Sequence, residues 1–149
     1  ILTTYTLKAI AEEWLATELI PLAGRDIGPC NACMFCRQEE RCSIKDDMFP
    51  IYLKMKAADG IILASPVYYG SATALIKGLM ERTGYISRHN GDPFSGKVGG
   101  PLVVPGSTYW NIALAREKGE VLDDEEGMRT AWNFGKNVAR VVKMLGDGK

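Results

Sequence analysis

Histidine is almost absent from this sequence, and a long hydrophobic run is missing altogether. The 149 residues include one histidine, His89, so a Ser-His-Asp or Cys-His hydrolytic site would have a single candidate base. His89 lies in the polar turn SRHNGD, which indicates a solvated loop residue. No apolar run approaches the roughly 18 residues of a membrane span, and no signal segment opens the chain. We therefore expect a globular, cytoplasmic protein without a membrane partner.

Net charge is also lacking. Eighteen basic and eighteen acidic residues give a formal charge of zero at pH 7. A protein that binds nucleic acid through its electrostatic field carries a basic surplus, so no nucleic-acid partner is expected. The acidic run at 123–126 is interpreted as the charged start of a helix rather than a metal site.

Cysteine is confined to one short stretch. All four cysteines, Cys30, Cys33, Cys36 and Cys42, fall in CNACMFCRQEERC, residues 30–42. A chain of this length can bury a core without disulfides. In a reducing cytosol, clustered cysteines indicate metal ligands or redox groups in preference to disulfides.

The cysteine spacing favours a particular metal centre. Thiolates are soft ligands that select an iron–sulfur cluster or zinc. Structural zinc with four cysteines typically uses two CxxC pairs held apart by a longer spacer, which this loop lacks. Three cysteines in steps of three, with a fourth close behind, are typical of a [4Fe–4S] cluster. Zinc, or thiols serving redox chemistry, remain as alternatives.

Apolar patterning predicts alternating helices and strands. Strands are expected at 17–22, 60–65 and 102–104, and helices at about 4–14, 46–58, 71–83 and 123–142. Thr3 or Thr4 is expected to cap the first helix, and Asp46 and Asp47 the second. This order predicts one α/β domain over 1–149, a doubly wound parallel sheet with helices on both faces. Three strands are visible, where about five are usual in such a domain.

A second candidate site follows the strand at 60–65. The segment ASPVYYGS, residues 64–71, lies at the carboxyl end of that strand, the edge where open α/β sheets bind ligands. Pro66 and Gly70 shape a turn with exposed amides, while Tyr68 and Tyr69 offer flat faces to a planar ring. An ordinary loop with packed tyrosines is the alternative. Beside an electron-transfer cluster, a flavin is the favoured ligand.

Together these segments resemble the iron–sulfur flavoproteins of the NAD(P)H-dependent FMN reductase group. The resemblance rests on the cysteine loop, ADGIILASPVYYGSATALIKGLMERTG, GKVGG, STYWNIA and KGEVLDDEEGMRTAWNFGKNVA, in that order. It implies a flavodoxin-like fold, FMN and a [4Fe–4S] cluster as cofactors, and a homodimer or homotetramer. The family's first strand, and a helix and strand near 104–106, have no counterpart here, and we expect that they are missing from this sequence.

The resemblance also implies roles for particular residues. The cluster ligands, in a loop at about 28–45, would be Cys30, Cys33, Cys36 and Cys42. The segment along the flavin ring would be Ser65, Pro66, Val67, Tyr68, Tyr69 and Gly70. Thr3 and Thr4 would remain from the loop that binds the FMN phosphate, and Tyr109 and Trp110 would lie near the flavin.

FMN exchanges two electrons and can release them singly, whereas a [4Fe–4S] cluster passes one at a time. The sequence therefore predicts a redox flavoprotein that transfers electrons between a one-electron carrier and an acceptor, without a catalytic acid or base. By resemblance, the carrier is ferredoxin-like. One alternative is an NAD(P)H-dependent FMN or quinone reductase without a cluster. A second is a non-enzymatic binding module stabilised by zinc.

Overall fold

The chain divides into two compact units in a computed structural model that describes residues 1–104, 115 and 119–146. The first, here called the sheet unit, comprises residues 1–19, 59–72 and 98–149. The second, the cysteine unit, comprises residues 20–58 and 73–97. Among the described residues, no helix has both the length and the apolar character to cross a membrane.

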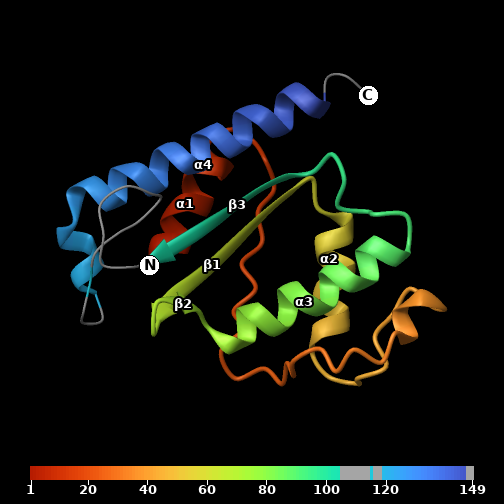
Figure 1. Cartoon of the computed structure of the whole chain (residues 1–149). Helices are drawn as coiled ribbons and strands as arrows, with labels where there is room; N and C mark the ends of the chain where they lie inside the picture. The colour runs from red at the N-terminus through yellow and green to blue at the C-terminus, as the bar shows by residue number, and fades with distance from the viewer. Residues whose placement is uncertain (105–114, 116–118, 147–149) are drawn as a thin grey trace. The chain divides into compact units, whose positions relative to one another are not determined.

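The sheet unit is built on three strands in the order β2-β1-β3 (Figure 1). Strand β1, Gly60–Tyr68, pairs in parallel with β3, Val98–Val104, in a register that runs from Gly60 opposite Val98 to Pro66 opposite Val104. The two-residue strand β2, Ser71–Ala72, pairs antiparallel with the end of β1. The predicted strands at 60–65 and 102–104 are confirmed, and each is longer than predicted.

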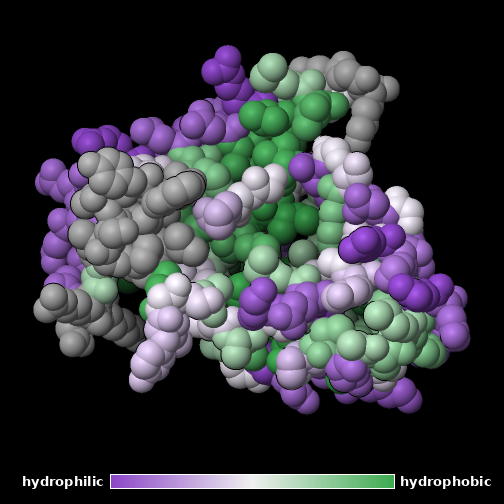
Figure 2. Space-filling view, in the orientation of Figure 1, coloured by the Kyte–Doolittle hydropathy of each residue, from purple (hydrophilic) through white to green (hydrophobic). Residues whose placement is uncertain are grey.

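Two helices complete the core of the sheet unit. Helices α1, Leu2–Ala11, and α4, Glu125–Gly146, approach so closely that a Cβ atom on Gly135 would lie 2.6 Å from the carbonyl oxygen of Thr6. The short helix η2, Glu120–Asp123, precedes α4. Asp124 Oδ1 accepts the Gly127 N–H at 2.9 Å, so an acidic side chain does begin α4, as predicted. The outward side of α4 is hydrophilic over its first part (Figure 2), whereas Val141, Met144 and Leu145 near its end are exposed apolar residues.

The cysteine unit contains α2, Met48–Ala57, and α3, Ala74–His89, with a single-turn helix η1, Phe35–Arg37, inside the cysteine loop. Tyr52 is fully buried, and its ring lies 5.8 Å from that of Phe94. A Cβ atom on Gly78 would lie 3.0 Å from the carbonyl oxygen of Gly28, so glycine lets the start of the cysteine loop pack against α3.

The prediction of a strand at 17–22 is wrong, because these residues are irregular. A strand needs a neighbour for its backbone hydrogen bonds. In the flavodoxin strand order 2-1-3-4-5, the second strand pairs only with the first, and no described residue supplies that first strand. Pro21 also lacks an N–H group, which weakens any pairing.

Helix boundaries also differ from the predictions. Helix α1 begins with Ile1 at the N-cap position, so neither threonine caps it, and it ends at Ala11. Trp14 lies beyond the helix with a φ of 63° and an exposed fraction of 94%, not on a buried face. Helix α3 begins at Ala74 because Ser71–Ala72 forms β2. Asp46 Oδ1, rather than Asp47, accepts the Met48 N–H at the start of α2.

The parallel pairing and the helix–strand alternation confirm the predicted α/β fold class. The single domain over 1–149 and the missing segment near 104–106 stay predictions.

We expect an acid-sensitive ion pair between the end of α1 and α4. Glu13 accepts hydrogen bonds from Lys143 at 2.9 Å and Lys136 at 3.0 Å, and these lower its pKa from 4.5 to about 2. A lowered pKa adds stability above pH 4.5, which is lost as the pH falls towards 2. Glu13→Gln should therefore flatten the decline of the unfolding free energy across this window, measured by denaturant titration.

The matched control is Glu12→Gln, because among the described residues Glu12 pairs with one lysine, Lys136 at 3.2 Å, where Glu13 pairs with two. Equal pH profiles for wild type and Glu13→Gln would contradict this assignment.

Candidate functional site

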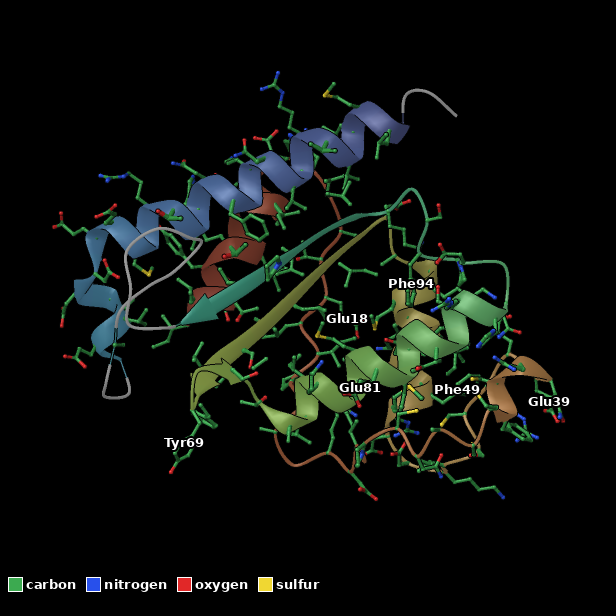
Figure 3. The ribbon with its side chains drawn as sticks, in the orientation of Figure 1. Glu18, Glu39, Phe49, Tyr69, Glu81 and Phe94 are labelled. Atoms are coloured by element: carbon green, nitrogen blue, oxygen red, sulfur yellow. The ribbon has the colours of Figure 1, made fainter. Side chains whose placement is uncertain are left out.

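The four cysteines line one pocket of the cysteine unit, together with Arg82, Tyr85 and Ile86 of α3. Cys30, Cys36 and Cys42 are half-buried, while Cys33 is exposed, and all four are free thiols. Sulfur atoms of this unit are visible beside α3 (Figure 3). The structure thus brings together the residues that the sequence predicted as cluster ligands.

The cysteine thiols differ in their electrostatic environment. A hydrogen bond with Ser43, 3.0 Å from Sγ to Oγ, lowers the pKa of Cys33, and the Phe35 N–H adds to the effect. Burial raises the pKa of Cys36, and negative charge on the other three cysteines raises it further. The same mutual repulsion would be relieved by positively charged iron, because metal binding favours the thiolate form.

The backbone on either side of Cys33 is left-handed. Ala32 has a φ of 55° and Met34 a φ of 60°, a region that non-glycine residues adopt at a cost. Such conformations cost of order 1–3 kcal/mol each and persist where the surrounding structure enforces them, often at ligand sites. The loop therefore bends sharply on both sides of Cys33, at a local cost in backbone free energy.

The donor set fits an iron–sulfur cluster better than a single ion. Among the described residues, no three His, Cys, Asp or Glu side chains lie in an arrangement that could hold one metal ion. Zn–S bonds of about 2.3 Å require tightly converging thiolates, whereas a cubane holds its four ligands farther apart. The pocket encloses about 20 Å³, roughly one water molecule.

Sequence reasoning missed Arg82. Its side chain is 1% exposed, forms an ion pair with Asp46, and donates from Nε to Cys42 Sγ at 3.3 Å. The signal was present, because Arg82 stands between Leu79 and Ile86 on the buried face of α3. A charged residue in a helix's apolar stripe predicts a buried partner.

The predicted flavin segment forms a tight hairpin in the sheet unit. Tyr68 and Ser71 pair across a two-residue turn, Tyr69-Gly70, with φ angles of 50° and 75°. Positive φ at both central positions defines a type I′ turn. Tyr69 is fully exposed and projects away from the end of β1 (Figure 3), and Tyr68 is 64% exposed. Ser65 is buried, and its hydroxyl donates to the Pro66 carbonyl at 2.8 Å.

The predicted phosphate segment lies in the same unit. Thr3 and Thr4 occupy the first turn of α1, where backbone N–H groups lack helical partners. Leu2 packs in one cluster with Leu102 and Ala64, so the start of α1 lies near the carboxyl ends of β3 and β1. The structure thus gathers both predicted FMN segments at one sheet edge. Tyr109 and Trp110 lie outside the described residues.

Comparison with known proteins places this chain among the flavin-dependent oxidoreductases. The chain belongs to the NADPH-dependent FMN reductase family, whose model matches residues 1–122. This finding confirms the predicted family and the predicted oxidoreductase class.

Several relatives carry the name iron–sulfur flavoprotein. One from Methanocaldococcus jannaschii is 35% identical over 97% of this chain and 90% of its own length. One from Archaeoglobus fulgidus is 40% identical over 73% of this chain, and one from Methanosarcina thermophila is 42% identical over 68%. The chain spans only 56% and 52% of these last two proteins. No solved structure matches the chain.

The alignment with the first relative runs over 176 positions, more than the 149 residues of this chain. That relative therefore has residues without a counterpart here.

Proposed function

We propose that this protein transfers electrons between a one-electron carrier and an acceptor through a [4Fe–4S] cluster and FMN. The observation that carries the proposal is the convergence of all four cysteines on one pocket. Three relatives named iron–sulfur flavoproteins support the choice of iron–sulfur over zinc. When bound, FMN supplies two-electron chemistry and the cluster one-electron chemistry.

In this proposal the cysteine loop holds the cluster through Cys30, Cys33, Cys36 and Cys42. Cys33 is the exposed ligand, so it lies on the side of the loop that a carrier protein can approach. The half-buried ligands and Arg82 limit the access of water and oxidants to the other side. The protein thus controls the exposure and the electrostatics of the cluster.

FMN is assigned to the edge of the sheet unit, with its ring along 65–70 and its phosphate at Thr3 and Thr4. The family supports FMN as the ligand, and the type I′ turn supports the position of the ring, because it presents a fully exposed aromatic side chain. Backbone N–H groups in the first turn of α1 suit an anionic phosphate.

Tyr69→Asn should separate binding from stability. Asparagine adopts positive φ more readily than tyrosine, and Asn-Gly is a favoured type I′ turn, so the variant should be more stable by about 1 kcal/mol. Loss of a stacked ring should weaken FMN binding about tenfold, as stacking on an aromatic side chain is worth about 1–3 kcal/mol. Tyr69→Phe, which keeps the ring, is the control. Titration of apoprotein with FMN measures the affinity, and unchanged affinity in Tyr69→Asn would remove Tyr69 from the site.

We further propose a homodimer or homotetramer, a ferredoxin-like electron donor and a cytoplasmic location. The expected chemistry supports the donor, since a cluster exchanges single electrons with other one-electron carriers.

The decisive experiment is an anaerobic purification with iron, sulfide and FMN quantified. We expect about four irons per chain, as the cluster type requires, together with a flavin absorbance band. Reduction by a ferredoxin should bleach both chromophores. One zinc per chain without flavin would instead indicate the zinc-stabilised module.

A second candidate, an NAD(P)H-dependent FMN or quinone reductase without a cluster, is favoured by the family's description as NADPH-dependent FMN reductase. Steady NAD(P)H oxidation by iron-free protein would select it. Activity that requires both iron and a one-electron donor would exclude it.

A further inference from the structure

Arg82 is the largest fully buried side chain among the described residues, and it is charged. Burying a guanidinium without partners would cost several kcal/mol, so its contacts determine its role. The side chain projects from the middle of α3 into the base of the cysteine loop.

All five guanidinium N–H groups have acceptors in the cysteine unit. Four of these contacts hold the guanidinium in place: Asp46 accepts from both terminal nitrogens, the Gly28 carbonyl from one of them at 3.2 Å and the Ile44 carbonyl from the other at 3.2 Å. The fifth contact runs from Nε to Cys42 Sγ at 3.3 Å. The two terminal nitrogens therefore hold the guanidinium in place, and the Nε–H group points at the sulfur of Cys42.

Asp46 extends this arrangement to the backbone. Its carboxylate also accepts the Gly28 N–H at 3.1 Å and the Met48 N–H at 3.2 Å. Gly28 and Asp46 flank the four cysteines in sequence, so the ion pair joins the two ends of the loop. The carboxylate is 3% exposed and balances the arginine's charge, so the effect of Arg82 on Cys42 comes mainly from the N–H directed at its sulfur.

We propose that Arg82 is a positioning residue for the cluster ligand Cys42 and that its Nε–H group sets the cluster's reduction potential. This inference rests on the proposed function, because it concerns the same four thiolates. A donor at a ligand sulfur stabilises the form with more negative charge, which is the reduced form. The donor also fixes the direction of the Cys42 side chain, and such outer contacts affect metal retention strongly.

The test compares Arg82→Lys with wild type after anaerobic loading with iron and sulfide. Lysine keeps a positive charge for Asp46 but lacks the planar fork, so Cys42 Sγ loses its fixed donor. We expect iron to be lost to a chelator at least about tenfold more readily, and the midpoint potential in a dithionite titration to fall below that of wild type. Arg88→Lys, on the exposed side of the same helix, is the matched control and should change neither.

A double variant, Arg82→Met with Asp46→Asn, guards against simple misfolding, because removing both charges leaves neither one buried alone. It should fold, by circular dichroism, and show the same lowered potential. Folded, loaded variants with wild-type potential and iron retention would overturn the role of Arg82 alone. If neither variant folds without iron, Arg82 belongs to the fold and the inference is wrong. A wild-type protein that takes up no iron would overturn both this inference and the proposed function.

Discussion

A Cys36→Ala variant is expected to lose the cluster while keeping the flavin. Cys36 is half-buried in the pocket, and the other three cysteines of the chain are already assigned to the cluster, so no further thiol can take its place. Iron should fall from about four to below one per chain, since a four-cysteine cluster needs every ligand. Electron uptake from a ferredoxin should fall with it. Iron analysis and the anaerobic visible spectrum measure the two effects.

The control for this prediction is Gln38→Ala, two residues along the same loop with an exposed side chain. It should retain iron at the wild-type level. A Cys36→Ala protein that holds about four irons and transfers electrons normally would contradict the ligand assignment, whatever its flavin content.

A Gly135→Ala variant is expected to destabilise the sheet unit by about 1–3 kcal/mol, the usual cost of overpacking. The added methyl group would lie 2.6 Å from the Thr6 carbonyl oxygen and 3.1 Å from Ala9 Cβ, so α1 and α4 must move apart. Because Thr6 also donates to the Ala131 carbonyl at 3.3 Å, that hydrogen bond should lengthen. Denaturant unfolding measures the change.

Gly84→Ala, by contrast, is expected to increase the stability of the protein. Gly84 lies within α3, and a Cβ atom there meets nothing within 4 Å. Alanine should therefore stabilise this helix, by up to about 1 kcal/mol from propensity alone. Equal stability of the two variants would show that the α1–α4 contact is looser than described.

Buried strands and strongly patterned helices could be predicted from the sequence because their signals are local. The run GIILAS indicates β1 without reference to any partner, and the acidic residues before Met128 indicate the start of α4. The strand predicted at 17–22 depended on a neighbour, which no local pattern supplies. The sequence predicted a turn shaped by Pro66 and Gly70, but β1 includes Pro66 and the turn is confined to Tyr69-Gly70. Its hairpin form could not be predicted, since tyrosine is an unusual residue at positive φ.

In the candidate site, too, the features with a local sequence signal could be predicted and those that depend on distant residues could not. The cysteine spacing predicts four thiolates in one place, and the structure confirms that they line one pocket. The partners of Arg82 could not be predicted, because Gly28 and Asp46 are 54 and 36 residues away in the sequence. Only the folded cysteine unit brings them together.

Helix α3 holds the cysteine loop at three successive levels: Gly78 against Gly28, Arg82 against Cys42, and Asn90, directly after the helix, against the Cys36 carbonyl at 2.9 Å. Each residue of an α-helix turns by about 100°, so a one-residue slip would pull all of these anchors out of line at once. Release of the metal centre should accordingly be a cooperative event, governed by the melting of one helix rather than by the successive detachment of single sulfurs.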